Sequence, residues 1–179
     1  MKADPAYLLR LAWKELQAAV SSPDHPWRTP VLVSGGSAAD GRVVVLRRFE
    51  RTPDRLTFFT DVRSPKVEAL RANSRITWVF YNPTQRFQVR VRAVAVVHHG
   101  TPGAQRDWEG LSVANRREYA SATAPGSPWP GTAPLAWEDA ARNFAVIETT
   151  ALEWDCLQLS RSEHGRVRFS GGDYERLVP

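Results

Sequence analysis

The chain has 179 residues, a formal net charge of +5 and a single cysteine. This length suits one domain, taken here as residues 1–179, which can bury a core without disulfide support. One cysteine cannot form an intramolecular disulfide, so Cys156 is interpreted as a small core residue of a protein in a reducing, cytoplasmic compartment. The sequence shows no apolar run of the ~20 residues that a membrane span needs, and no signal-peptide core near its start.

Arginine supplies most of the positive charge, because the only lysines are Lys2, Lys14 and Lys66. Guanidinium groups favour bidentate contacts to phosphates and carboxylates, so the composition favours an anionic ligand. Nucleic acid is the competing partner for a basic chain. The arginines are interleaved with 19 acidic residues and form no continuous basic face, so we expect no nucleic-acid binding. No metal-ligand cluster or nucleophile triad stands out, and catalytic residues stay unassigned.

The first half of the chain predicts one helix followed by strands. Apolar residues recur at helical spacing from Asp4 to Val20, with Asp4 as N-cap and Pro5 as the first helical residue. Residues 30–34 predict a strand, and the glycine-rich stretch after it is interpreted as a hairpin turn, since it lacks P-loop spacing. Residues 42–49 predict a strand that is buried on both faces, and residues 56–60 return beside it as a hairpin.

The stretch that follows predicts an anion site. Ser64 can cap a helix over residues 65–72, in which Pro65 takes the first helical position. The free N–H groups of such a helix N-terminus attract anions, and Ser64 and Lys66 add a hydroxyl and an ammonium group.

The remaining elements complete a mainly β fold. Residues 75–81 and 85–98 predict antiparallel strands, the second with apolar residues at every other position from 87 to 95, and together the strands favour a barrel of about six strands. Residues 102–122 predict one or two flanking helices. The Pro- and Gly-rich residues 124–134 predict an irregular segment that serves function or moves. Residues 144–149 and 152–159 predict two strands, with Glu148 and Glu153 solvated at the turn between them.

Four motifs resemble the FMN-binding split-barrel family typified by pyridoxamine 5'-phosphate oxidase, and more closely a branch of FMN-binding proteins related to that enzyme. They are RVVVLRRF from Arg42, LTFFTDVRSPKVEAL from Leu56, ITWVFYNPTQRFQVRV from Ile76 and the terminal YERLVP. The resemblance implies a six-stranded antiparallel split β-barrel with flanking helices, and FMN as cofactor.

The resemblance also implies which residues bind FMN. Its phosphate would be held by Arg42, Ser64 and Lys66, although Pro65 stands where the family has a further arginine. The remaining cofactor-binding positions implied by the family are the backbone around Val45 and Leu46, then Arg47, Phe59, Thr60 and Gln88.

Residues near the C-terminus would complete the site from a partner subunit. His164 and Arg166 resemble a family His-x-Arg motif, in which the histidine serves the substrate and the arginine approaches the flavin; a shifted alignment would select Arg168. The resemblance therefore implies a homodimer with FMN at its interface. The alternative for this stretch is a solvated hairpin turn.

The substrate positions depart from the family pattern. The family clamps a substrate phosphate with Tyr, Arg and Ser four residues apart, whereas this chain has Tyr119, Thr123 and Ser127. The tryptophan expected beside the flavin aligns with Cys156, next to Trp154. The resemblance therefore does not imply that this chain has strict pyridoxamine 5'-phosphate oxidase activity.

Three functions follow as hypotheses. The first is an FMN-dependent oxidoreductase that moves a hydride between a small substrate and flavin N5. The second is a flavin-binding carrier or sensor without catalysis. The third keeps the barrel and changes the ligand to heme or a deazaflavin; His98 and His99 are the histidines considered for heme, and a paired ligand for them is not apparent.

Overall fold

The computed structural model describes residues 4–35, 39–129, 131–132, 134, 136–159 and 164–179. Its helices are α1 (Pro5–Ser21), α2 (Pro65–Ala72), α3 (Pro102–Glu109), α4 (Val113–Arg117), α5 (Ala140–Asn143) and the short 3₁₀ helix η1 (Trp137–Asp139). Its strands are β1 (Val31–Gly35), β2 (Ala39–Val43), β3 (Arg48–Glu50), β4 (Arg55–Asp61), β5 (Arg75–Asn82), β6 (Phe87–His98), β7 (Phe144–Leu159), β8 (His164–Ser170) and β9 (Asp173–Leu177). Among the described residues, no helix is long and apolar enough to cross a membrane.

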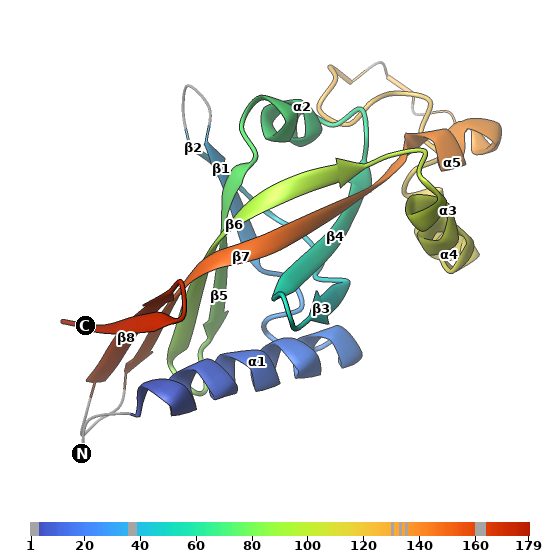
Figure 1. The fold of residues 1–179 in the computed structure, drawn as a ribbon. Helices are drawn as coiled ribbons and strands as arrows, with labels where there is room; N and C mark the ends of the chain where they lie inside the picture. Colours follow the sequence, from blue (N-terminus) through green and yellow to red (C-terminus); the bar gives the residue numbers. More distant parts are fainter. Residues whose placement is uncertain (1–3, 36–38, 130, 133, 135, 160–163) are drawn as a thin grey trace.

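The strands form one antiparallel sheet in the order β2-β1-β5-β6-β7-β4-β3, with β8 and β9 continuing from β7. The two ends of this order, β2 and β3, are consecutive in the chain and joined by residues 44–47. Counting β2 and β3 as one bent strand gives six strands around the barrel, and the β8–β9 hairpin lies outside it. The mainly β fold class is confirmed (Figure 1).

The predicted strand over residues 42–49 is interrupted, and only part of it is buried. After Val43 the chain leaves β1: the Val44 and Leu46 amides donate to the carbonyl oxygens of Pro30 and Arg28, and the Arg47 amide donates to Thr57 of β4. These residues therefore cross from one end of the sheet order to the other. Burial on both faces was wrong for Val43, whose side chain is 63% exposed.

The two strands predicted over residues 144–159 are one strand, β7. Glu148 and Glu153 both lie within it, and no turn separates them. Their side chains contact Arg55 and Arg92 at 3.6 Å, so the prediction of two solvated turn residues was wrong. The pairing with β6 shifts register between Arg92 and Ala93, which shows that an irregularity occurs here while the strand continues.

One face of the sheet lines the main core. The buried residues of β6 are the five predicted from alternation: Phe87, Val89, Val91, Ala93 and Ala95. Helix α1 lies along the lower side of the barrel and buries its apolar stripe, with Asp4 as N-cap as predicted (Figure 1). Trp27 is fully buried and packs 5.1 Å from Phe80 between ring centroids, as a packing residue should.

A second, smaller core joins the helical region to the barrel. It contains Tyr119, Phe144 and Val146, with Phe59 and Trp108 packed against it. Helices α3 to α5 gather on this side of the molecule, while β8 lies on the opposite side (Figure 1).

Candidate functional site

The strongest candidate site begins where β4 enters α2. Helix α2 starts at Pro65, as predicted, and Ser64 occupies the N-cap position without making the expected side-chain cap. The Ser64 hydroxyl instead donates to the Asp61 carbonyl oxygen at 2.7 Å. Lys66 Nζ donates to Thr60 Oγ1 at 3.2 Å, and the Thr60 and Ser64 hydroxyl oxygens are 3.3 Å apart. The structure thus brings Thr60, Ser64 and Lys66 together.

Arg42 joins this group from β2. In the sheet register Arg42 pairs with Leu32, whose side chain is fully buried, so both side chains point to the inner face. Arg42 Nη1 donates to Ser34 Oγ at 2.6 Å, and its other terminal nitrogen pairs with Asp40. Burial, and secondly the nearby charge of Arg42, lower the pKa of Lys66 below its ordinary value. This is a partly desolvated pair of cations beside two hydroxyls, which suits a phosphate.

A second group lies around Phe59. The guanidinium carbons of Arg47 and Arg48 are 5.6 and 5.8 Å from the centre of the Phe59 ring. Arg48 is paired with Asp107 of α3, whereas Arg47 Nε is buried without a hydrogen-bond partner among the described residues. An unpartnered buried N–H is costly, so Arg47 fits a site whose acceptor comes from a ligand.

Val45 and Leu46 lie between the two groups. Leu46 is fully buried in the main core, and Val45 is half-buried. The Leu46 amide donates to the Arg28 carbonyl oxygen, so contact of this stretch with a flavin stays a prediction.

Gln88 and Arg166 lie on the other face of the sheet. Gln88 pairs with Leu157, and Leu157 pairs with Arg166, so the three side chains form one row across β6, β7 and β8. Gln88 alternates with the buried Phe87 and Val89, which places the row on the outer face. Within one chain, this row and Arg42 are therefore on opposite faces and do not meet.

Arg166 is held in place by a carboxylate. Its Nε and Nη2 donate to the two oxygens of Asp155 at 3.0 and 2.9 Å, and Arg90 pairs with the same carboxylate. Burial would raise the pKa of Asp155, but the two arginines outweigh it and lower that pKa. His164 is exposed at the start of β8, on the same face as Arg166 and Arg168.

The predicted substrate residues are not gathered together. Tyr119 is 5% exposed and packs against Phe144 with ring centroids 5.1 Å apart, and burial raises the pKa of its hydroxyl to about 12. Ser127 is exposed on the irregular segment. The structure thus uses Tyr119 as a core residue, while Thr123 and Ser127 remain near the surface.

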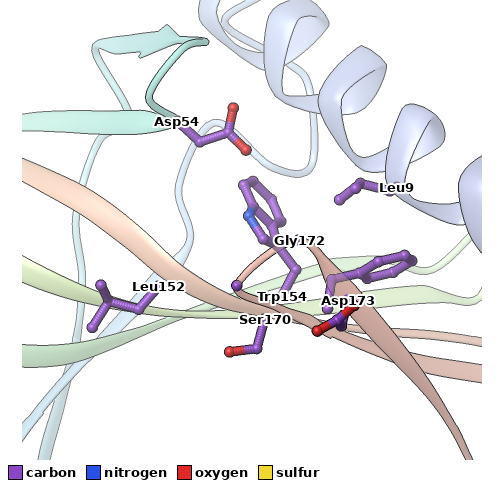
Figure 2. Close-up of a pocket in the computed structure, with 9 residues that line it drawn as sticks. Leu9, Asp54, Leu152, Trp154, Ser170, Gly172 and Asp173 are labelled. Carbon is purple, nitrogen blue, oxygen red and sulfur yellow. The ribbon is translucent and has the colours of Figure 1, made fainter.

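A separate cavity of about 220 Å³ lies between α1 and the β7–β8–β9 side of the sheet (Figure 2). Trp154, Phe169 and Asp54 line it, and none of the predicted cofactor residues does. Trp154 and Cys156 alternate with Asp155 and face inward, away from the Arg166 row. Neither is therefore beside the groups that contain Arg42 or Arg166 within this chain.

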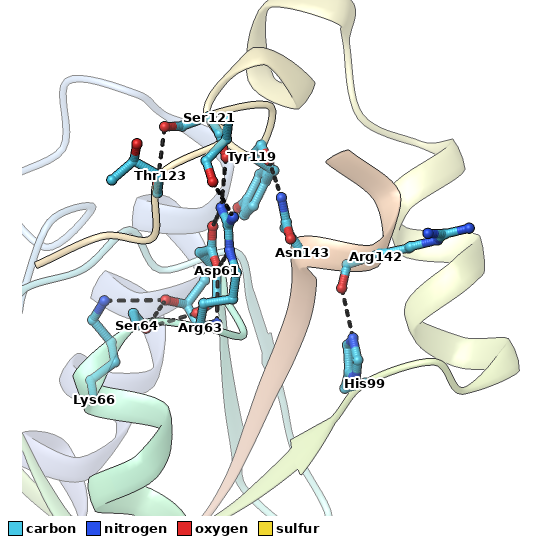
Figure 3. Close-up of polar contacts among 12 residues, drawn as sticks. Asp61, Arg63, Ser64, Lys66, His99, Tyr119, Ser121, Thr123, Arg142 and Asn143 are labelled. Carbon is cyan, nitrogen blue, oxygen red and sulfur yellow. Dashed lines mark hydrogen bonds and ion pairs between the residues drawn. The ribbon is translucent and has the colours of Figure 1, made fainter. Parts of the chain in front are cut away.

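Sequence reasoning missed the partners of the site. Asp40, Asp61 and Ser34 contact the predicted cations or hydroxyls, and Arg63 braces the neighbouring segment (Figure 3). Asp61 and Arg63 lie inside the motif that carried Thr60 and Ser64. The spacing of two residues between Asp61 and Arg63, just before the N-cap of α2, was the sequence signal that could have indicated their contact.

Comparison with known proteins tests the family resemblance. Residues 12–99 match the family model described as the FMN-binding domain of pyridoxamine 5'-phosphate oxidase. The resemblance to the pyridoxamine 5'-phosphate oxidase-like FMN-binding family is confirmed. Among the described residues, no group of three or more potential ligand side chains could hold a metal ion.

Individual proteins are similar to this chain in sequence or in fold. The chain is 33% identical over 129 residues to pyridoxine/pyridoxamine 5'-phosphate oxidase 2 of Arabidopsis thaliana, a match that spans 65% of this chain and 64% of the plant protein. A Nostoc punctiforme pyridoxamine 5'-phosphate oxidase-related, FMN-binding protein has a similar fold, with 22% identity, full coverage of both chains and a TM-score of 0.77. PhzG of Burkholderia lata is similar at 18% identity and a TM-score of 0.72, with 96% and 92% coverage.

Proposed function

We propose that this protein binds FMN and acts as an FMN-dependent oxidoreductase on a small substrate. The observation that carries the proposal is that residues 42–47 contribute an arginine to each of two side-chain groups. Arg42 stands with Lys66 beside two hydroxyls, and Arg47 stands beside Phe59 with an unpartnered N–H. Five extended residues span at most about 17 Å, which suits a ligand with a phosphate at one end and an aromatic ring at the other.

The residues of the chain would divide the binding between them. Arg42, Lys66 and the Ser64 hydroxyl would hold the phosphate through charge-assisted hydrogen bonds. Arg47 Nε would donate to a polar atom of the ring system, and Phe59 would support the ring. When bound, FMN supplies hydride chemistry at its N5 atom, which these side chains do not provide themselves.

We propose a homodimer in which the outer face of a second copy completes the site. Gln88 and Arg166 share that face and cannot reach Arg42 within their own chain. The same face exposes apolar side chains, including Val31, Val43 and Tyr81. An exposed apolar area of this kind, next to ordered charged pairs, is typical of an interface between subunits.

A titration of ligand-free protein tests the cofactor. We expect FMN to bind at least ~100-fold more tightly than riboflavin, because the charge-assisted contacts at Arg42 and Lys66 need the phosphate. Protein purified with FMN should show flavin absorption bands. Equal affinity for both ligands, or a bound heme spectrum, would contradict the proposal.

Turnover separates an enzyme from a carrier. In an enzyme, the flavin of the FMN-loaded protein should be reduced as a hydride-donating substrate is oxidised, and O2 should then re-oxidise the flavin; flavin that is reduced and re-oxidised without turnover of any substrate would support the carrier or sensor hypothesis. Pyridoxamine 5'-phosphate is the first compound to assay, given the similarity to the plant oxidase. We expect weak turnover, because Thr123 cannot supply the charge of the family's substrate-binding arginine. The cytoplasmic location stays a prediction.

A further inference from the structure

The side chain of Arg63 connects the β4–α2 loop to the segment that follows α4. Its Nη2 and Nη1 donate to the carbonyl oxygens of Ser121 and Ala122 at 2.9 and 3.3 Å. Its Nε and Nη2 also donate to the two carboxylate oxygens of Asp61, at 3.0 and 2.7 Å. Figure 3 shows the guanidinium group between the loop and the segment.

The charge of Arg63 is used within the protein. Asp61 is 7% exposed and accepts from the Arg63 backbone amide at 2.8 Å as well as from its guanidinium group. The hydrogen bonds to Asp61 are the main reason why the pKa of Arg63 is raised. The planar guanidinium group of Arg63 therefore binds a carboxylate and two carbonyl oxygens at once, which connects the loop to the segment. The single ammonium group of a lysine could not reproduce this geometry.

Asn143 forms a second connection between the same two parts of the chain. Its side-chain amide donates to the Tyr119 carbonyl oxygen at 2.8 Å, and its own carbonyl oxygen accepts from the Val62 amide at 2.7 Å. Asn143 is itself buried, so these bonds are protected from solvent.

Pro65 and Gly126 form a third connection. A Cβ atom added at Gly126 would lie 3.1 Å from Pro65 Cγ, and Gly126 has a φ of +84°. The positive φ favours glycine at this position, and a side chain here would also press on the first turn of α2. Pro65, which stands in place of a family arginine, has become a packing surface for the segment.

We propose that Arg63 is a positioning residue that holds residues 119–126 against the Thr60–Lys66 group, so that the conformation of this segment and ligand binding at the group are coupled. The proposal rests on the proposed function, because it takes the ligand of that group to be FMN. Asp61 makes the link: its carboxylate holds Arg63, and its carbonyl oxygen holds the Ser64 hydroxyl at 2.7 Å.

Coupling between two parts of a protein is reciprocal. An FMN phosphate that orders Ser64 and Lys66 should therefore slow opening of residues 119–126, and loosening the segment should weaken FMN to the same extent. Couplings of this kind typically change affinity about 5- to 150-fold. We expect a change in affinity of about tenfold here, near the lower end of that range. Arg63 is one of three connections between the segment and the loop, so its loss leaves the other two in place.

Hydrogen exchange of the wild type with and without FMN, compared with Arg63→Gln, tests the proposal. The Ala122 and Ala136 amides report on the segment, since they donate to the Pro134 and Ala120 carbonyl oxygens. In the wild type, FMN should slow their exchange about tenfold. In Arg63→Gln they should exchange faster without FMN and respond to it less than twofold, and the FMN dissociation constant should rise about tenfold. Arg63→Lys should resemble Arg63→Gln.

The control variant is Arg71→Gln, which removes the same charge from an exposed position in the last turn of α2. It should exchange and bind FMN like the wild type. Gly126→Ala perturbs the segment from the other side and should also weaken FMN; this variant keeps the test decisive if Arg63→Gln does not fold.

The outcomes separate the two proposals. Wild-type protein that binds no FMN would overturn the proposed function and the coupling with it, while faster exchange in Arg63→Gln would still support the bracing role. Bound FMN with unchanged exchange in residues 119–126 would overturn the coupling alone. Arg63→Gln with wild-type exchange and FMN affinity would show that Arg63 is not a positioning residue.

Discussion

At the residue scale, the phosphate-binding group places like charges close together before any ligand arrives. Arg42 contributes to lowering the pKa of Lys66, and Asp40 and Asp61 only partly compensate. Holding two cations in this way costs free energy in the ligand-free protein. Under the proposed function, a bound dianion would remove that cost, so part of the affinity for FMN would come from relief of the repulsion between Arg42 and Lys66.

The lowered pKa of Lys66 makes FMN binding pH-dependent. In the proposed site Lys66 would bind phosphate in its charged form, and in the free protein that form is lost as pH rises through a pKa lowered from 10.5. FMN affinity should therefore fall on the alkaline side, and riboflavin affinity, measured in parallel, corrects for titration of the ring. In Lys66→Gln, FMN affinity should drop by roughly 10- to 100-fold, and the ratio of the FMN and riboflavin dissociation constants should no longer change with pH.

Much of this group could be predicted from sequence, because its members are local. Ser64 and Lys66 lie at one helix start, which the Ser-Pro pattern predicts, and the family resemblance implied Thr60 beside them. The contacts of Arg63 could not be predicted in the same way. Arg63 reaches carbonyl oxygens 58 and 59 residues away, and no local pattern marks a carbonyl acceptor. Tyr119 matches the four-residue spacing of the family's substrate residues, but its side chain points into the second core.

At the element scale, α1 is attached to the barrel by a buried carboxylate as well as by its apolar stripe. Glu15 Oε2 accepts from Asn82 Nδ2 at 3.0 Å, and Glu15 Oε1 accepts from Gln85 Nε2 at 2.9 Å. His25 lies 3.3 Å from the same carboxylate. One side chain therefore ties the helix to the β5–β6 turn and to the connection that follows the helix.

Removing this carboxylate should destabilise the fold. Glu15→Ala leaves the Asn82 and Gln85 amides without their acceptor, and we expect the free energy of unfolding to fall by about 1–3 kcal/mol, measured by urea denaturation. Lys14→Ala, at the neighbouring exposed position of α1, should change it by less than about 0.5 kcal/mol. Equal effects in the two variants would contradict the role given to Glu15.

Element boundaries show where sequence patterns stop being informative. The alternation in β6 and the cap of α1 were sufficient to define those elements. Residues 42–49 were predicted as one strand because residues 43–46 are continuously apolar, yet the hydrogen-bond partners of this stretch change from β1 to residues 28–30 and then to β4. The divided prediction for β7 had the opposite cause: Glu148 and Glu153 indicate a turn, but cross-strand arginines keep them within the sheet.

At the scale of the whole molecule, the two halves of the proposed site lie on opposite faces of one sheet. A site completed by a second copy should bind FMN in a manner that depends on protein concentration. Light scattering should show a dimer, and a stable monomer that binds FMN with full affinity would refute this arrangement.

Leu157 offers a direct test, since it lies between Gln88 and Arg166 in the outer row. Leu157→Arg adds a charge to the proposed interface and should shift the protein to monomers, with FMN affinity reduced about tenfold or more, although Arg42 and Lys66 are unchanged. Val178→Arg, at an 87% exposed position beyond β9, is the control and should remain dimeric.

The bent strand formed by β2, residues 44–47 and β3 has a consequence for ligand choice. Arg42 and Arg47 belong to one uninterrupted length of backbone, so the separation of the two ends of the site is set by the number of residues between them. Substitutions can change the side chains that line the site, but they leave the backbone distance between Arg42 and Arg47 almost unaltered. An insertion between Val43 and Leu46 would instead turn Arg42 or Arg47 toward the wrong face. A protein of this design that evolved toward a shorter or longer ligand would have to gain or lose residues here.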